Sequence, residues 1–367
     1  MRAIPFDKPR VLSYSDSIGT NSFIYGSGPI ARELWFSSMA RWAVARGLSM
    51  RKIAFVVIVA AVALWISPPA GAFLGTGILP SGGFFGAGPS CDSAPSPCGL
   101  IVPPIVYVGW NDDRRGISFS GGNSAGLNAV ARFGQQHRVR GLWLGVTQPL
   151  NLSENLSILG SGWYLFPEGN EATEYYITTG GVQSLRTWTV SDEWWFVEGL
   201  AAIRTGYLSG FALLAGLRYD YFYSKGSGPV AVGLIPSSPL DEEDATSKAL
   251  IPLLGAQFAF TSPVSSLTLR VVGFPTVTGS FRARENVAAG ASPDEGTGNY
   301  DGGYFLEVFS EISRQMAGIN LGAFARWNAL HGRLPSFDVS APGVTRTFDS
   351  ELDRHSWTVG GTISVNF

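Results

Sequence analysis

The sequence predicts an all-β protein in which about ten antiparallel strands close into a single transmembrane β-barrel. Three observations lead to this prediction. Apolar and polar residues alternate with a period of two over many short segments, so each segment has one oily face and one polar face. Short and long connections between these segments alternate, as they do in transmembrane barrels. The 367 residues are 15% charged and 13% aromatic, a composition unusual for a soluble enzyme of this length.

Residues 50–72 have the three parts of a secretory signal peptide. A short basic start precedes an apolar run over residues 53–66 and a small-residue end, Ala70-Gly71-Ala72. The apolar run of about 14 residues is shorter than the roughly 20 that a spanning helix needs. We therefore favour a cleaved signal peptide, with an uncleaved anchor as the alternative.

A signal peptide is expected at the very start of a chain, so residues 1–49 need an explanation. We interpret them as an over-extended start or a disordered segment, with translation beginning at Met50. The alternative is a long arginine-containing segment ahead of the apolar run. Residues 73–104 are rich in Gly, Pro and Ser, which predicts a flexible periplasmic lead-in to a barrel over residues 105–367.

Two cysteines, Cys91 and Cys98, lie in this lead-in. In an oxidising compartment they can close a small loop. Two cysteines without nearby histidines make a poor set of metal ligands. We therefore predict a disulfide or two idle thiols rather than a metal site.

Regular alternation begins after His137 and gives nine segments. They cover residues 138–148, 155–166, 192–204, 209–223, 248–260, 267–274, 303–314, 319–329 and 355–367. A tenth strand is expected earlier, from one of two briefly alternating stretches near residues 106–110 and 116–121. Totals of eight or twelve also fit the even numbers that such barrels favour. Polar segments are predicted to be long extracellular loops, over residues 167–191, 225–247, 275–302 and 331–354.

The segment 209–223 shows which face should meet lipid. One row, from Phe211 to Tyr223, is apolar and ends in three tyrosines, as expected where a strand leaves the hydrocarbon. The opposite row carries Arg218 and Asp220. The same comparison across the segments predicts a lumen with charges of both signs: Glu198, Arg204, Arg218, Asp220, Arg270, Glu307, Glu311 and Arg326.

Two hairpins give a predicted register for these charges. A tight turn at Met316-Ala317 would place Glu307 directly opposite Arg326. A turn centred on Tyr207 would place Glu198 diagonal to Arg218. The mixed charges then have two interpretations: a structural network that plugs the barrel, or the lining of a narrow water path for small solutes.

The last segment resembles the terminal assembly signal of Gram-negative outer-membrane β-barrels. Its alternate residues from Trp357 to the terminal Phe are apolar or Gly, and the predicted signal consists of Trp357, Val359, Ile363, Val365 and Phe367. The run Gly216-Leu217-Arg218-Tyr219 is similar to a strand common in small porin-like and OmpA-like barrels. The resemblance covers about residues 50–367 and transfers an architecture without catalytic or binding residues.

The resemblance implies an outer-membrane location in a Gram-negative cell. It also implies contacts with outer-membrane lipid and lipopolysaccharide and assembly by the barrel-assembly machinery, and it leaves the oligomeric state undecided. A net charge of −2 gives no support for nucleic-acid binding, which needs a basic face. We predict no cofactor and no metal. The acidic run 241–244 lacks the alternating ligands of a calcium loop, and the glycine pairs fit no phosphate-binding frame.

Residues suited to catalysis are few. His331 and His355 flank one predicted outer loop, with Asp338, Asp349 and Asp353 nearby in sequence. This is the best enzymatic constellation available, but loop residues of these types are usually solvated, and we predict no enzyme. The predicted function is porin-like passage of small polar solutes. The alternative is a closed structural barrel whose extracellular loops bind a surface partner.

Overall fold

The computed structural model describes most of the predicted barrel segment. The described residues are 102–120, 130–153, 155–178, 183–204, 210–232, 240–262, 265–286, 294–316, 319–341 and 344–365. The predicted signal peptide, Cys91, Cys98 and Phe367 lie outside them. Within the described residues, no helix is long and apolar enough to cross a membrane.

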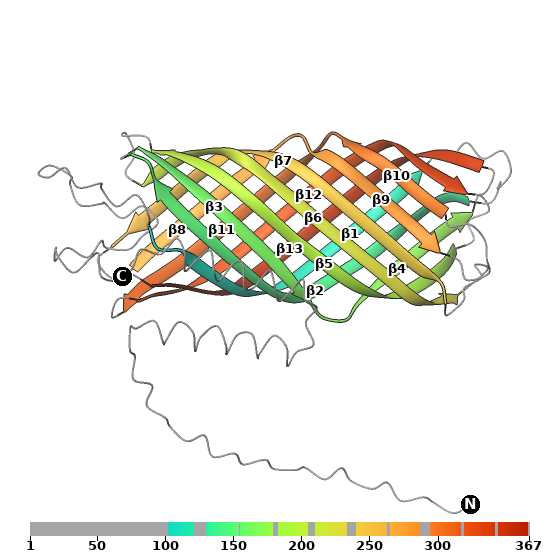
Figure 1. Cartoon of the computed structure of the whole chain (residues 1–367), viewed down its shortest axis with the longest axis horizontal. Coiled ribbons are helices and arrows are strands. Elements are labelled where there is room, and N and C mark those ends of the chain that lie inside the picture. Colours follow the sequence, from blue (N-terminus) through green and yellow to red (C-terminus); the bar gives the residue numbers. More distant parts are fainter. Residues whose placement is uncertain are drawn as a thin grey trace, which may run out of the picture. The chain divides into compact units, whose positions relative to one another are not determined.

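Thirteen strands form one antiparallel sheet in this part of the chain. They are β1 (Ile105–Ser120), β2 (Val130–Asn151), β3 (Leu156–Pro167), β4 (Asn170–Thr178), β5 (Gln183–Arg204), β6 (Phe211–Val232), β7 (Glu242–Thr261), β8 (Ser265–Phe274), β9 (Thr278–Asn286), β10 (Asp294–Asp301), β11 (Gly303–Met316), β12 (Ile319–Ala341) and β13 (Val344–Val365). Strands β13 and β1 pair with each other, so the sheet closes into a barrel (Figure 1).

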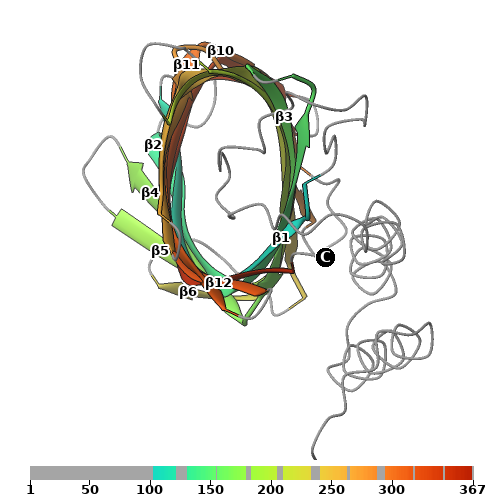
Figure 2. The ribbon, with the colours of Figure 1, turned by 90° about the vertical axis from the view of Figure 1, so that its left-hand side faces the viewer.

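Three pairs of consecutive strands continue one another, so the ring has ten positions. Near one end of the barrel, three positions of the ring are occupied by β3, β8 and β11. Near the other end, the same three positions are occupied by β4, β9 and β10, respectively. In each of these three positions, the chain passes from one strand to the next near Pro167, Pro275 or Gly302. Proline cannot donate to the ladder, and Gly302 has a φ of 101°. Figure 2 shows the closed ring end-on. The single antiparallel barrel predicted from the sequence is confirmed.

The outward side chains change character partway along the strands. On β2, Leu142 and Leu144 face outward near one end, while the exposed side chains further along are Arg138 and Arg140. On β6, Leu213 and Leu217 are about half exposed, whereas the next exposed positions beyond Tyr223, Lys225 and Ser227, are polar. An exposed apolar belt of this kind is what lipid solvates in a transmembrane barrel.

We call the two parts of the barrel the membrane tier and the outer tier. The membrane tier comprises residues 105–111, 141–150, 156–166, 194–204, 211–223, 249–261, 265–274, 304–316, 319–328 and 357–365. The outer tier comprises the remaining strand residues. Large aromatic side chains lie near the boundary, including Trp110, Trp195, Tyr221 and Trp357. Aromatic rings at this position are typical of a membrane interface.

The prediction of long extracellular loops was wrong for most of the residues concerned, which form strands. Residues 170–178 form β4, 278–286 form β9 and 294–301 form β10, while β5, β6, β7, β12 and β13 all extend into the outer tier. Outside the membrane the outward row does not need to be apolar, so the alternation disappears while the backbone ladder continues. Both stretches considered for the first strand belong to β1.

The barrel interior is packed with side chains. In the membrane tier, a buried aromatic cluster includes Tyr107, Trp143, Trp163, Trp194, Phe196, Phe309 and Phe324. The Trp143 and Trp194 ring centroids are 4.6 Å apart, and those of Tyr107 and Phe324 are 5.3 Å apart. A second buried cluster extends into the outer tier and includes Phe119, Phe281, Leu334 and Phe337. These rings fill the space that the strands enclose.

Candidate functional site

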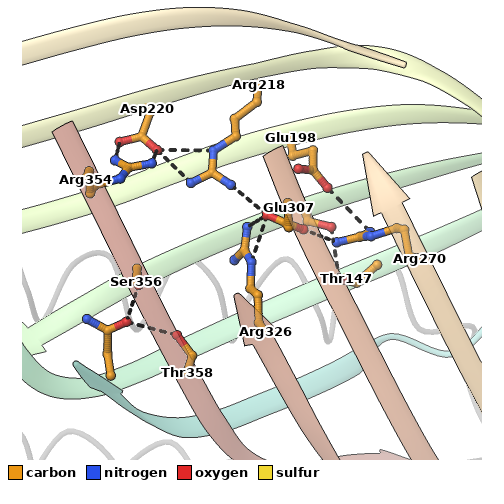
Figure 3. A network of polar contacts seen from close by, with 12 residues as sticks. Thr147, Glu198, Arg218, Asp220, Arg270, Glu307, Arg326, Arg354, Ser356 and Thr358 are labelled. Atoms are coloured by element: carbon orange, nitrogen blue, oxygen red, sulfur yellow. Dashed lines mark hydrogen bonds and ion pairs between the residues drawn. The ribbon is translucent and has the colours of Figure 1, made fainter. Parts of the chain in front are cut away.

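The candidate site is a buried network of charges in the membrane tier, centred on Glu307 of β11. Glu307 has no exposed side-chain area and accepts hydrogen bonds from three arginines. Arg218 donates from Nη1 at 3.0 Å, Arg270 from Nη2 at 2.9 Å and Arg326 from Nε at 2.9 Å (Figure 3). One carboxylate therefore connects β6, β8, β11 and β12. Hydrogen bonds of this charge-assisted kind are the stronger ones in proteins.

The position of Arg326 differs from the predicted register by two residues. Arg326 lies opposite Phe309, and Glu307 lies opposite Asn328. The last described pair of this hairpin is Met316 with Ile319, which moves the turn one residue further along the chain than predicted. The prediction of a directly opposed pair was wrong, yet Arg326 reaches Glu307 diagonally because its side chain is long.

The second predicted hairpin is also shifted. Glu198 lies directly opposite Arg218 rather than diagonal to it. The ion pair of Glu198 is with Arg270, whose Nη1 lies 3.5 Å from Glu198 Oε1. Arg218 instead points toward Glu307 and Asp220 (Figure 3). Cross-strand position alone did not determine the partner of either charge.

Asp220 forms a second centre within the same network. It accepts hydrogen bonds from Arg218 Nη2 at 2.6 Å, from Arg354 Nη1 at 2.9 Å and from Trp194 Nε1 at 2.9 Å. The sequence did not single out Arg354, because it falls at the end of a segment predicted to be a loop. It also missed the buried pair of Asp113 and Arg115, which precede the first regular strand pattern.

Two predicted lumen charges lie nearer the end of the barrel at which β13 ends. Glu311 accepts hydrogen bonds from Tyr107 Oη at 3.1 Å and from Thr362 Oγ1 at 3.3 Å. Arg204 is the last residue of β5, with a partly buried side chain. The structure therefore gathers Glu198, Arg218, Asp220, Arg270, Glu307 and Arg326 into one network and places Glu311 and Arg204 beyond it.

The arginines of the network also stack on aromatic rings. The Arg218 guanidinium carbon lies 3.6 Å from the Phe196 ring centroid, and that of Arg326 lies 4.2 Å from the same ring. Arg115 lies 3.5 Å from the Phe222 centroid. Stacking on a ring face stabilises a desolvated guanidinium and fixes its plane. Charged and aromatic side chains thus form one packed layer.

The formal charges of this buried layer balance when Glu311, which lies just beyond the network, is counted with it. Among the described residues there are then five arginines and five carboxylates: Arg115, Arg218, Arg270, Arg326 and Arg354 with Asp113, Glu198, Asp220, Glu307 and Glu311. One cavity beside the layer is lined by Tyr107, Trp163, Arg270 and neighbouring side chains, and a second is lined by Arg115, Asp220, Arg354 and neighbouring side chains. The layer can hold the barrel walls together, and it presents no uncompensated charge to a solute.

The residues considered for catalysis do not assemble into one site. His331 Nδ1 lies 2.8 Å from Asp353 Oδ1 on the outer face of the barrel. Asp338 accepts a hydrogen bond from Thr347, further along the same hairpin, and His355 lies opposite Ala329. Across the described residues, no group of three or more His, Cys, Asp or Glu side chains is arranged to hold a metal ion.

The structure describes three side chains of the predicted assembly signal. Trp357, Val359 and Ile363 face outward on β13, with exposed fractions of 59%, 54% and 41%. The Val365 side chain and Phe367 lie outside the described residues. Contact with the barrel-assembly machinery stays a prediction.

No protein-family model and no curated protein matched this sequence. Among solved structures, the outer-membrane protease OmpT from Escherichia coli is similar with a TM-score of 0.58 and 7% identity, covering 73% of this chain and 98% of that one. The chain has the fold of an outer-membrane β-barrel. The transport unit of the autotransporter AIDA-I from Escherichia coli is a more distant match, with a TM-score of 0.29 and 9% identity over 71% of this chain and 90% of that one.

The predicted location in the outer membrane is supported by this fold and by the exposed apolar belt. At 7% identity, the likeness of this outer-membrane β-barrel to OmpT concerns the fold alone. The prediction that the chain is not an enzyme stays a prediction. Binding of lipopolysaccharide likewise stays a prediction, and the oligomeric state is undecided.

Proposed function

We propose that this protein is a closed outer-membrane barrel that does not pass solutes and acts through its outer tier. The observation that carries the proposal is Glu307, which joins arginines from three other strands in the middle of the lumen. This is the second of the two functions considered from the sequence. The porin-like function would require the same lumen to contain an open path.

The network spans the lumen within the membrane tier. Arg218 and Glu307 belong to strands that are not neighbours in the ring, so their contact crosses the enclosed space. The aromatic rings of Trp163 and Phe196 pack against the same guanidinium groups. A passing solute would have to displace both the rings and the ion pairs.

The energy needed to open this layer is considerable. A rearrangement that leaves one of these charges buried without its partner costs about 3–5 kcal/mol. Opening the layer around Glu307 separates more than one pair. The network therefore favours the closed barrel.

The outer tier gives the closed barrel a surface beyond the membrane. Strands β5, β6, β12 and β13 each contain 22 or 23 residues, far more than the 9–11 or so that a tilted strand needs to span a bilayer. The additional residues include polar outward side chains, such as Lys225 of β6, which pairs with Glu242 of β7 at 3.0 Å. We infer that a partner in the surrounding medium would meet this tier.

Liposome swelling tests the closed barrel. Purified protein is inserted into liposomes, which are then diluted into an isosmotic solution of a small neutral sugar. The expected swelling rate equals that of protein-free liposomes, because the packed layer blocks the sugar. Rapid swelling that scales with the amount of folded protein would contradict the proposal and favour porin-like passage. Resistance to unfolding by detergent at room temperature, followed by gel electrophoresis, verifies that the inserted protein is folded.

A further inference from the structure

A second polar cluster crosses the lumen near the outer end of the barrel. Its members come from five strands: Gln135 of β2, Glu174 of β4, Arg186 of β5, Glu243 of β7 and Glu285 of β9. On one wall, Glu174 lies directly between Gln135 and Arg186 in the strand register. On the facing wall, Glu243 lies directly opposite Glu285. We call these five residues the mouth clasp.

The two walls are joined by side chains that reach across the opening. Gln135 Nε2 donates to Glu243 Oε2 at 3.1 Å and to its Oε1 at 3.2 Å. Arg186 Nη1 donates to Glu285 Oε1 at 2.5 Å, and Arg186 Nε donates to Glu174 Oε2 at 2.6 Å. Strands β2 and β7 are separated in the ring by β4, β5 and β6. The contacts therefore close the outer end of the lumen.

The clasp holds three carboxyl groups and one guanidinium, so it has a net charge of −2 when every group is ionised. Like charges directly opposite one another on neighbouring strands repel, which applies to Glu243 and Glu285. Burial and the adjacent charges of Glu174 and Glu285 hold the pKa of Glu243 well above its usual value of 4.5. A carboxyl group that lies beside other carboxylates takes up a proton more readily than an isolated one.

The groups that face Glu243 come from each neighbouring wall. Glu174 approaches from β4, Glu285 approaches from β9, and Arg186 approaches from β5. On β6 the register partner is Gly226, which has no charge. Arg186 opposes the rise in the pKa of Glu243, but burial and the two glutamates outweigh it. The neighbouring Glu242 points outward to Lys225.

We propose that the mouth clasp is a pH-dependent closure of the outer end of the lumen, shut while Glu243 holds a proton and released when that proton is lost. At low pH Glu243 is neutral, and the clasp has a charge of −1. As the pH rises above the usual range for a glutamate, the charge becomes −2 and the walls repel. Stabilisation of the shut form is therefore present at acidic pH and lost toward alkaline pH.

Release would expose the part of the lumen below the clasp. A cavity there is lined by Gln135, His137, Ser247 and Phe281, so it shares Gln135 with the clasp. Its lining also includes Arg354 and Asp220 of the buried network. That network lies deeper and has its own contacts, so the barrel stays closed to solutes in both states of the clasp. The inference is independent of the proposed function, and each can fail alone.

Cysteine labelling tests the closure. Ser247→Cys places a thiol beneath the clasp, and Ser227→Cys places one at an exposed position on the outer face of β6, both with Cys91 and Cys98 replaced by Ser. Folded protein in liposomes is treated with a charged, membrane-impermeant maleimide between pH 4 and pH 9. The ratio of the two labelling rates removes the intrinsic pH dependence of the thiol reaction. The ratio is expected to rise several-fold toward alkaline pH.

Two further variants, each carrying the thiol at position 247, assign the change to Glu243. Glu243→Gln resembles the protonated carboxyl at every pH, so position 247 should stay protected throughout. Glu242→Gln changes the adjacent outward side chain and should keep the rise of the parent protein. A flat ratio in the parent would overturn the proposal, and so would an unchanged rise in Glu243→Gln. Gel electrophoresis without heating verifies that each variant is folded.

Discussion

Arg218 of β6 and Glu307 of β11 are joined across the lumen by a hydrogen bond of 3.0 Å, although their strands are not neighbours in the ring. Neither side chain has any exposed area. Glu307 also binds Arg270 and Arg326, so one carboxylate balances three buried guanidinium groups together with Glu198 and Asp220. This arrangement explains how a barrel with a charged interior can be closed.

Replacing the central carboxylate should destabilise the barrel strongly. Glu307→Gln keeps the shape of the side chain but leaves buried guanidinium groups without their counter-charge, a change that costs about 3–5 kcal/mol. The measurement is reversible urea unfolding in lipid vesicles. Glu242→Gln breaks an exposed pair with Lys225 and should cost no more than about 1 kcal/mol. Equal costs for the two variants would contradict the central role of Glu307.

The boundary between the two tiers can be tested on one strand. Leu217 of β6 is 55% exposed in the apolar belt, whereas Ser227 is an exposed residue of the same strand in the outer tier. Leu217→Arg should cost about 2–4 kcal/mol, and Ser227→Arg about 0–1 kcal/mol, because only the first charge must enter hydrocarbon. Unfolding in vesicles measures both. A cost for Ser227→Arg as large as that for Leu217→Arg would show that the belt has been placed wrongly.

The packing of the aromatic cluster depends on glycine at position 145. A Cβ atom there would lie 2.4 Å from the Trp163 ring, whereas a Cβ at Gly162 would meet nothing within 4 Å. Gly145→Ala should therefore displace Trp163 and cost about 1–3 kcal/mol through overpacking. Gly162→Ala, one residue from Trp163, should change the unfolding free energy by about 0.5 kcal/mol or less. Near-ultraviolet circular dichroism should change only in Gly145→Ala, and an unaltered spectrum would contradict this packing.

The His331–Asp353 pair lies on the outer face, and its side chains are 22% and 53% exposed. We expect His331→Ala to change stability by less than about 1 kcal/mol, because exposed ion pairs contribute little. Since the chain is predicted not to be an enzyme, His331→Ala and His355→Ala should leave peptide hydrolysis by intact cells at the level of the parent. A loss of hydrolysis in either variant would refute that prediction.

The sequence predicted the membrane tier well because lipid imposes a strict pattern on it. A strand such as β6 must present apolar side chains outward, and Leu213 and Leu217 do so, so the inward positions of Arg218 and Asp220 follow from the period of two. No comparable constraint acts on the outer tier. The polar outward row there made 225–247 resemble a loop, although most of it belongs to β6 and β7.

The sequence did not predict which charged side chains pair with each other, and the reason is different. Hairpin register depends on the turn, and a shift of the turn by one residue moved Glu307 from Arg326 to Asn328 in the ladder. Contacts across the lumen, such as that of Asp220 with Arg354, join strands that are distant in the ring. Alternation shows that such side chains point inward, but it does not show which of them meet.

Planar-bilayer recording is the most direct test of the closed lumen. Purified, folded protein is added to a bilayer in concentrated salt, and the current is followed under an applied voltage. We expect a silent membrane, because the layer of ion pairs and aromatic rings around Glu307 leaves no path for ions. Stable, uniform current steps that appear with the folded protein and are absent from heat-unfolded samples would contradict it.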